Sequence, residues 1–183
     1  QVRQTLETAQ QNGSARLLLN ELFQRSLRVG KRARAETDIG RGRLSISTAA
    51  VELASQVFEN IQSCRVLLVG AGEMGELTAQ YLVDAGVAHL QVTNRTHARA
   101  AELAARFGGE AVPFATLTEQ LATVDIVITS TAATDPVISL DELRAAMHQR
   151  RGRPLFLIDI AVPRDIDPQA RTIDNVFLFD IDD

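Results

Sequence analysis

Cysteine is almost missing from this sequence of 183 residues, which contains only Cys64. A single cysteine excludes an intramolecular disulfide and a cysteine-based zinc site, and it is typical of a reducing compartment. No apolar run is long enough to cross a membrane, and no signal peptide is recognisable. We therefore expect a cytoplasmic protein that makes no membrane contact.

Histidine is scarce as well, and its positions do not suggest a metal site. No pair among His89, His97 and His148 shows metal-ligand spacing, so we predict no metal. A net charge of -4 argues against a chain built mainly to coat nucleic acid. The local basic run from Arg25 to Arg43 is interpreted as a solvated helical face, and contact with nucleic-acid phosphate is the less favoured alternative.

The chain falls into two regions of different periodicity. Residues 1–60 are predicted to be helical, since apolar residues such as Leu18 and Leu22 recur close to a 3.6-residue period. Residues 37–45 are polar and include two glycines, which predicts a loop. Residues 61–183 are predicted to form a nucleotide-binding domain. Because the chain begins without methionine, we expect a piece of a longer protein.

From Arg65 the pattern alternates between strand and helix. Apolar runs predict strands at 65–69, 89–94, 125–130, 154–162 and 175–180, with a weak strand at 110–113. Helices are predicted at 73–85 and 97–107, and capping boxes at Thr116 and Ser139 predict two further helix starts. This order predicts an α/β fold: a Rossmann-type doubly wound parallel sheet, with strand order 3-2-1-4-5-6, preceded by the N-terminal helical segment.

A glycine-rich turn follows the first predicted strand and opens a helix. Gly70, Gly72 and Gly75 have the G-x-G-x-x-G spacing in the strand–turn–helix context that dinucleotide binding requires. The glycines permit the tight turn, the approach of a pyrophosphate and close helix packing, and the amides at the helix N-terminus bind phosphate. We predict that the cofactor contacts Gly70, Ala71, Gly72, Glu73, Met74 and Gly75. The alternative is a glycine turn that binds no ligand.

The acidic residue that usually holds the adenosine ribose, about twenty residues further on, is absent. Its place is taken by Asn94, Arg95 and Thr96, with Arg99 one helical turn along. A guanidinium pairs with a 2'-phosphate, which a carboxylate would repel, and Asn94 can still bond to the ribose. We therefore predict NADPH rather than NADH, with Arg95 as the main selector. A solvated helix start is the alternative.

Two loops are candidates for the nicotinamide end of the cofactor. Ligands of open α/β sheets lie at the carboxyl ends of the strands, which points to Ser130, Thr131 and Ala132 and to residues 161–164. Ordinary loop structure is an equal alternative for both. Cys64 precedes the first strand, at the opposite end, so we interpret it as a small buried hydrophobic residue and not as a catalytic thiol.

The chain closely resembles bacterial glutamyl-tRNA reductase. The resemblance covers essentially the whole chain, and it rests on "LFQRSLRVGKRARAET", "SISTAAVELA", "VLLVGAGEMGELTAQYL", "VTNRTHARA", "DIVITSTAA", "IDIAVPRDIDP" and "NVFLFDIDD". Shikimate dehydrogenase also has a Rossmann turn followed by "NRT". However, "DIAVPRDIDP" and the ending "DIDD" are similar to the reductase and not to shikimate dehydrogenase.

This resemblance implies NADPH-dependent reduction of glutamyl-tRNA to glutamate-1-semialdehyde, the first step toward 5-aminolevulinate and tetrapyrroles. The family's nucleophile is a cysteine in a "TCNR"-like motif, which this chain lacks and Cys64 does not match. The chain thus resembles the cofactor domain with its connecting helices, without the catalytic and dimerisation parts, and we expect it to be inactive alone. Gln1 is implied as a substrate contact. The implied partners are glutamyl-tRNA, a second copy in a homodimer and the downstream aminotransferase.

Two other functions stay open. A shikimate-dehydrogenase-like NADP oxidoreductase is one, but that enzyme needs a catalytic lysine, and the only lysine, Lys31, lies outside the predicted nucleotide domain. The other is a non-catalytic nucleotide-binding module that binds a partner through residues 1–60.

Overall fold

The structure, a computed structural model, describes residues 2–36, 46–58 and 60–182. It divides into two compact units, Gln1–Leu44 and Ser45–Asp183. The predicted loop at 37–45 and the implied substrate contact Gln1 lie outside the described residues. Within the described ranges, no helix combines the length and apolar character that crossing a membrane would require.

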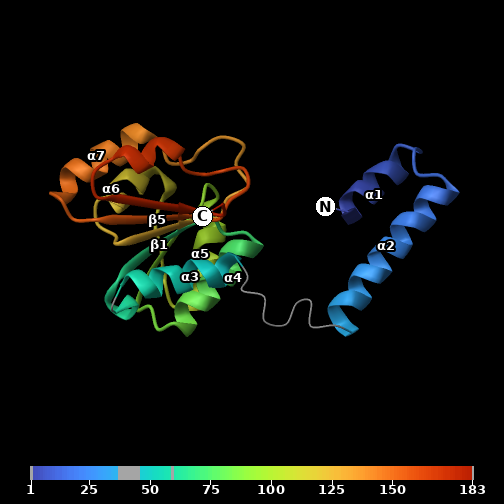
Figure 1. Cartoon of the computed structure of the whole chain (residues 1–183), viewed down its shortest axis with the longest axis horizontal. Coiled ribbons are helices and arrows are strands. Elements are labelled where there is room, and N and C mark those ends of the chain that lie inside the picture. Colours follow the sequence, from blue (N-terminus) through green and yellow to red (C-terminus); the bar gives the residue numbers. More distant parts are fainter. Residues whose placement is uncertain (1, 37–45, 59, 183) are drawn as a thin grey trace. The chain divides into compact units, whose positions relative to one another are not determined.

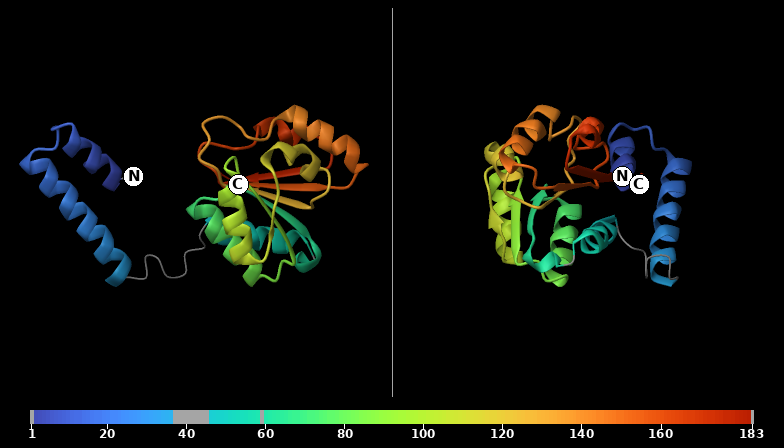
Figure 2. Two further views of the ribbon diagram at one scale, coloured as in Figure 1. Left: turned by 180° about the vertical axis from the view of Figure 1, so that it is seen from behind. Right: turned by 60° about the vertical axis from the view of Figure 1, so that its left-hand side comes forward.

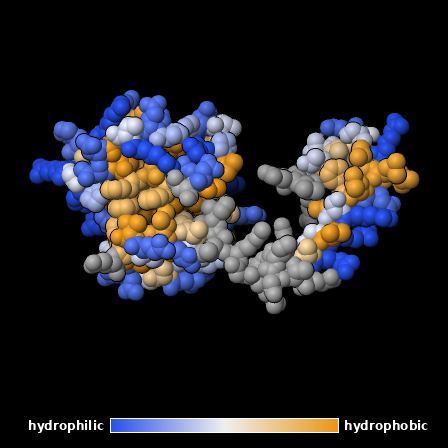
Figure 3. Space-filling model, viewed as in Figure 1, coloured by the Kyte–Doolittle hydropathy of each residue, from blue (hydrophilic) through white to orange (hydrophobic). Residues whose placement is uncertain are grey.

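The first unit is a pair of helices, α1 (Val2–Gln11) and α2 (Leu17–Glu36), which pack against each other. The helical prediction for this region is confirmed. Apolar side chains nevertheless remain on the surface of α2, where Leu18 is 84% and Leu22 is 59% exposed. Figure 3 shows hydrophobic residues on the surface of both units. The periodicity of α2 therefore marks an apolar stripe that the described residues of its own unit leave open.

A parallel sheet of six strands forms the centre of the second unit in the described residues (Figure 1). The strands are β1 (Arg65–Val69), β2 (His89–Thr93), β3 (Glu110–Ala111), β4 (Ile126–Thr129), β5 (Leu155–Asp159) and β6 (Val176–Asp180). Their order is β3-β2-β1-β4-β5-β6, which confirms the predicted fold class and strand order. Val69 pairs with Thr93 on one side and Thr129 on the other, so the carboxyl ends of the central strands meet at one edge.

Helices cover both faces of this sheet (Figures 1 and 2). One face is covered by α3 (Ile46–Val57), α4 (Glu73–Asp84) and α5 (His97–Phe107). The other is covered by α6 (Leu117–Leu121), α7 (Leu140–Arg150) and the short 3-10 helix η3 (Pro168–Thr172). Two more 3-10 turns lie in the connections, η1 (Ile61–Ser63) and η2 (Phe114–Thr116).

The central strand β1 is buried on both faces. Val66 and Leu68 pack with the α3–α5 side, whereas Leu67 and Val69 pack with the α6–α7 side, and all four have 0% exposure. A continuous apolar run is what a parallel strand covered by two helical layers requires, because neither set of alternating side chains meets water.

By its packing, α3 belongs to the sheet unit. It contacts α4, and the buried Thr78 hydroxyl donates a hydrogen bond to the Ser47 hydroxyl over 2.9 Å. Ala50 and Ala54 lie in the core of the same face. The division between the compact units at 44/45 therefore precedes the sequence-based boundary at 60/61, since that boundary followed the local pattern and not the tertiary packing of α3.

The two predicted capping boxes have different outcomes. Ser139 caps α7: its hydroxyl accepts from the Glu142 amide, and the Glu142 carboxylate accepts from the Ser139 amide. The box predicted at Thr116 is wrong, although α6 does begin there. The Thr116 hydroxyl donates to the Pro113 carbonyl within the preceding 3-10 turn, so it does not cap the helix.

Candidate functional site

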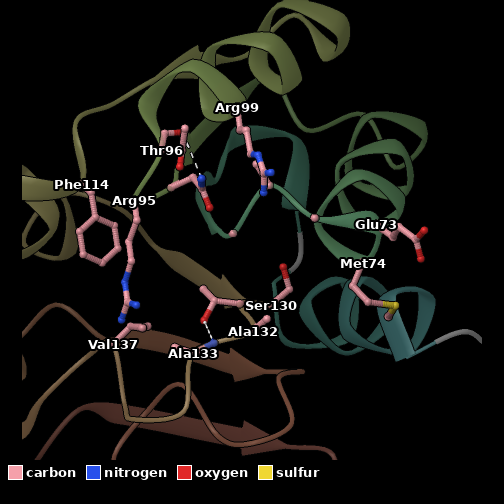
Figure 4. A pocket seen from close by; sticks show the side chains of 15 residues that line it. Glu73, Met74, Arg95, Thr96, Arg99, Phe114, Ser130, Ala132, Ala133 and Val137 are labelled. Carbon is pink, nitrogen blue, oxygen red and sulfur yellow. Dashed lines mark hydrogen bonds between the residues drawn. The ribbon is translucent and has the colours of Figure 1, made fainter. Parts of the chain in front are cut away.

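A cavity of about 500 Å³ lies at the carboxyl edge of the sheet (Figure 4). Four loops build it: the glycine turn after β1, and the segments that follow β2, β3 and β4. The residues predicted for the glycine turn, the end of β2 and the loop after β4 all line this cavity, except Gly75. These loops come together because the parallel strands that they follow end at the same edge.

The glycine turn has backbone positions that leave no room for a side chain. Gly70 has a φ of +112°, and a Cβ on it would lie 2.9 Å from the Ser130 carbonyl oxygen. A Cβ on Gly75 would lie 2.2 Å from the Gly70 carbonyl oxygen. Gly75 thus allows α4 to pack closely against the glycine turn, and it does not line the cavity. At Gly72, by contrast, a Cβ would meet nothing within 4 Å, so this backbone faces open space.

The N-terminus of α4 opens into the same space. Gly72 is the N-cap residue and provides no side-chain cap, and the first amides of a helix have no acceptor within the helix. Those amides and the helix dipole favour an anion. The acidic Glu73 also lies in this turn, but its side chain extends away from Arg95 and Phe114, toward the far side of the site (Figure 4).

Two arginines provide positive charge at the end of β2. In the described residues, neither the Arg95 nor the Arg99 guanidinium forms a hydrogen bond or an ion pair, and both residues are exposed. Arg95 extends past Phe114 toward Val137, and Arg99 lies between Thr96 and the glycine turn (Figure 4). The two cations therefore face different parts of one cavity.

Asn94 and Thr96 shape the turn that carries these arginines. The Asn94 side-chain amide donates to the Thr96 carbonyl over 3.0 Å, so its oxygen stays available as an acceptor for a ligand hydroxyl. Thr96 is the N-cap residue of α5 and makes no side-chain cap bond, which leaves its hydroxyl at the cavity.

The two loops predicted for the nicotinamide end have separate positions. Ser130, Thr131 and Ala132 line the cavity together with the glycine turn and Arg95. Residues 161–164 do not; they line a separate cavity of about 210 Å³ with the segment 180–182. The structure therefore groups residues 130–132 with the phosphate-binding and arginine-bearing loops, and it does not group residues 161–164 with them.

Sequence reasoning missed three apolar residues of the cavity. Phe114 follows β3, and Ala133 and Val137 follow β4. The sequence did contain a signal for Phe114. Because the strands are parallel, the loop that follows the third strand starts at the same edge as the loops that follow the neighbouring strands. Phe114, Ala133 and Val137 give the cavity an apolar surface beside its arginines, which suits a flat base next to a phosphate.

The opposite edge of the sheet contains Cys64 and His89, two residues that we did not predict to contact the cofactor. Cys64 is 6% exposed and lies before β1, and burial, with a smaller effect of Asp125, raises the pKa of its thiol. This confirms Cys64 as a buried structural residue, since the thiolate is the reactive form and is disfavoured here. His89 begins β2 at the same edge. In the part of the chain that the structure describes, no group of three metal-binding side chains occurs.

Comparison with known proteins identifies relatives of the whole chain. The family model described as "Shikimate / quinate 5-dehydrogenase" matches residues 52–183. The chain is 49% identical, over all 183 residues, to proteins named glutamyl-tRNA reductase from Syntrophobacter fumaroxidans and Bacillus subtilis. The solved glutamyl-tRNA reductase from Methanopyrus kandleri superposes with a TM-score of 0.71 at 45% identity, covering 100% of this chain and 46% of that one.

The match is complete for this chain but partial for its relatives. The chain spans about 40% of the length of the two curated reductases. These comparisons fit a fragment of a glutamyl-tRNA reductase, and they support a nicotinamide cofactor for the nucleotide-binding fold.

Proposed function

The chain belongs to the shikimate / quinate 5-dehydrogenase family, and from this premise we propose that it is the cofactor-binding part of an NADPH-dependent glutamyl-tRNA reductase. The observation that carries the proposal is the cavity at the carboxyl edge, where a glycine turn meets Arg95 and Arg99, two arginines that form no ion pair with any described residue. The 49% identity to glutamyl-tRNA reductases along all 183 residues supports the choice of reaction. The product of that reaction is glutamate-1-semialdehyde.

The residues of this chain fit a phosphorylated dinucleotide. The backbone at Gly72 and the first amides of α4 would hold the pyrophosphate. The pyrophosphate can approach the backbone closely because Gly72 has no side chain, and the amides at the helix N-terminus would donate hydrogen bonds to it. Arg95 and Arg99 would pair with the 2'-phosphate, and Asn94 would accept from the ribose. When bound, the cofactor supplies a hydride.

The chain's own contribution is to bind and orient that cofactor. Its one thiol, Cys64, is buried at the amino edge of the sheet, with its pKa raised by burial. A nucleophile that forms a thioester with the glutamyl group must therefore come from outside these residues, and we expect the chain alone to bind NADPH without turnover. We extend the proposal to a cytoplasmic location, because Cys64 is unpaired.

The partners belong to the whole protein and are part of the same proposal. The names of the relatives support glutamyl-tRNA as the substrate. We further propose that the complete protein is a homodimer, that Gln1 contacts the glutamyl group and that the downstream aminotransferase receives the aldehyde. An aldehyde product is reactive toward water and amines, so a nearby consuming enzyme would protect it.

Isothermal calorimetry with NADPH and NADH tests the cofactor. We expect NADPH to bind more tightly than NADH. Arg95→Ala should lower the affinity for NADPH by about tenfold and leave the affinity for NADH nearly unchanged, because only NADPH has the phosphate that Arg95 would pair with. Arg106→Ala is the matched control: Arg106 also lies on α5, but it pairs with Glu76 and does not line the cavity. Equal affinities for both nucleotides in the unaltered chain would refute the NADPH proposal.

The family match also favours a second candidate, a shikimate-dehydrogenase-like oxidoreductase acting on a small hydroxy acid. The only lysine, Lys31, lies on α2, in the first unit and outside residues 52–183 that match the family. NADP-dependent oxidation of shikimate by the 183-residue chain would support this candidate. We expect no such activity, because the lysine that this chemistry needs is absent from the matched residues.

A further inference from the structure

Two buried carboxylates, Asp159 and Asp165, lie where β5 leaves the sheet. Their exposed fractions are 1% and 0%, and in the described residues neither forms an ion pair. Asp159 accepts four hydrogen bonds, from the Thr129 hydroxyl and from the amides of Ala161, Asp165 and Ile166. Because two of these amides belong to Asp165 and its neighbour, Asp159 fixes the position of Asp165.

Asp165 in turn binds the loop that follows β4. One of its carboxylate oxygens accepts from the Thr131 amide over 2.7 Å, and the other accepts from the Thr131 hydroxyl over 2.5 Å. The same hydroxyl accepts from the Ala133 amide over 3.1 Å, so its single proton is directed to Asp165. An ionised carboxylate satisfies both donors of Thr131, whereas a protonated carboxyl or an amide has only one oxygen free to accept.

This connection reaches the cofactor cavity indirectly. Thr131 and Ala133 line the cavity, and Asp165 does not. Val137, also in the lining, donates its amide to the Asp165 carbonyl over 2.7 Å. Figure 4 shows Arg95 extending toward this wall, close to Val137 and Ala133. Asp165 therefore holds the wall that faces the arginine proposed to select the 2'-phosphate.

Resting on the proposed function, we propose that Asp165 is a positioning residue for the adenosine half of the cofactor. Its carboxylate ties the segment after β5 to Thr131 and so holds Ala133 and Val137, the apolar wall beside Arg95, against the base and its ribose. This role differs from a direct contact, because Asp165 acts entirely through the residues that line the cavity.

The charge of Asp165 makes the role measurable. Burial raises the pKa of Asp165, and nearby Asp159 raises it further, whereas the hydrogen bonds from Thr131 and the positive charge of Arg95 lower it. Asp159 and Arg95 are thus the charged groups that face it, from β5 and from the turn before α5. Protonation removes one acceptor from Thr131, so nucleotide affinity should fall as the pH drops through this raised pKa.

ADP-ribose is the probe for this test, since it has the adenosine half of the cofactor and no phosphate monoester whose charge would change over the same range. In the 183-residue chain we expect its affinity to fall on acidification. We expect Asp165→Asn to lower the affinity for ADP-ribose by about tenfold at neutral pH and to abolish the pH dependence of that affinity. Positive charge gained at the cavity would strengthen the binding of this anionic probe, so the sign of the effect separates a change in charge from the loss of the Asp165 acceptor.

The matched control is Asp167→Asn, two residues along the same segment. Asp167 caps η3 through the Gln169 amide and does not line the cavity, so we expect unaltered affinity and an unaltered pH profile. If Asp165→Asn binds ADP-ribose as the unaltered chain does at every pH, Asp165 does not position the nucleotide and the proposal is overturned.

A second pair of variants applies if Asp165→Asn does not fold. Thr131→Ser keeps the hydroxyl that donates to Asp165 and should keep the pH dependence of ADP-ribose affinity, whereas Thr131→Val should bind ADP-ribose more weakly and without pH dependence. Equal affinities and pH profiles for these two variants would overturn the proposal. If the unaltered chain binds neither ADP-ribose nor NADPH, the proposed cofactor function itself fails, which distinguishes that failure from the failure of the Asp165 role alone.

Discussion

The two edges of the sheet differ in chemistry, although both have cavities with arginine side chains. The amino edge has a cavity of about 420 Å³ whose lining includes Arg65, His89 and Glu110. The carboxyl edge has one of about 500 Å³ with Arg95 and Arg99. Only the carboxyl edge adds helix N-termini, because every crossover helix in a parallel sheet starts there and ends at the opposite edge. Residue type alone therefore does not identify a phosphate site; the direction of the helices does.

Glycine substitutions should have the largest effects, and these effects should differ between the two edges. Gly75→Val should destabilise the fold by about 3 kcal/mol and abolish NADPH binding, because its side chain would displace the Gly70 carbonyl, 2.2 Å from the Cβ position. Gly109→Ala introduces a similar conflict at the amino edge, with a Cβ 2.7 Å from the Leu90 carbonyl oxygen. Thermal unfolding should show a loss of stability in both variants, but Gly109→Ala should keep its NADPH affinity. If both variants lost NADPH affinity to the same extent, the loss would reflect general destabilisation and not the position of the glycine at the carboxyl edge.

Arginine substitutions should have a smaller effect, which we expect at the carboxyl edge and not at the amino edge. Arg99→Ala should weaken the binding of NADPH by about fivefold in calorimetry, because a cation beside the glycine turn is lost. Arg65→Ala removes an exposed arginine from the cavity at the amino edge and should leave the affinity unaltered. If Arg65→Ala weakens NADPH as much as Arg99→Ala does, the effect is a general one of net charge and not of position.

Cys64 should give the smallest effect, and one confined to stability. Its thiol pKa is raised above the ordinary value of 9.0, mainly by burial, so the folded chain binds the proton more tightly than the unfolded chain does. This contribution is fully present below the ordinary thiol pKa and is lost as the pH rises through the raised one. Denaturant unfolding should therefore show that the unaltered chain loses slightly more stability in alkali than Cys64→Ala does. NADPH affinity should be equal in the two, and a difference would place Cys64 nearer to the cofactor than the sheet allows.

Much of the fold was predictable because its signals are local. The buried run at 65–69, the glycines that follow it and the alternation of strands and helices are each readable within a few residues, and together they predict the sheet order. The lining of the cavity followed from the same order, since parallel strands place Gly72, Asn94 and Ser130 at one edge.

What could not be predicted depends on where a group finds its partner. The Thr116 hydroxyl bonds to Pro113 because a 3-10 turn brings that carbonyl within reach, and the capping pattern contains no sign of that turn. The link from Asp165 to Thr131 spans 34 positions, so no local motif reports it. The assignment of α3 to the sheet unit likewise depends on its contact with α4.

The buried thiol has a practical consequence for spectroscopy. Since Cys64 is 6% exposed and ionises with difficulty, maleimide reagents at neutral pH should leave it unmodified. A cysteine placed at Thr96, on the rim of the cavity, would then be the sole reactive thiol in the chain. A fluorophore attached there would follow nucleotide occupancy in real time, and one at His89 on the opposite edge would serve as the silent reference. No background cysteine would have to be removed first.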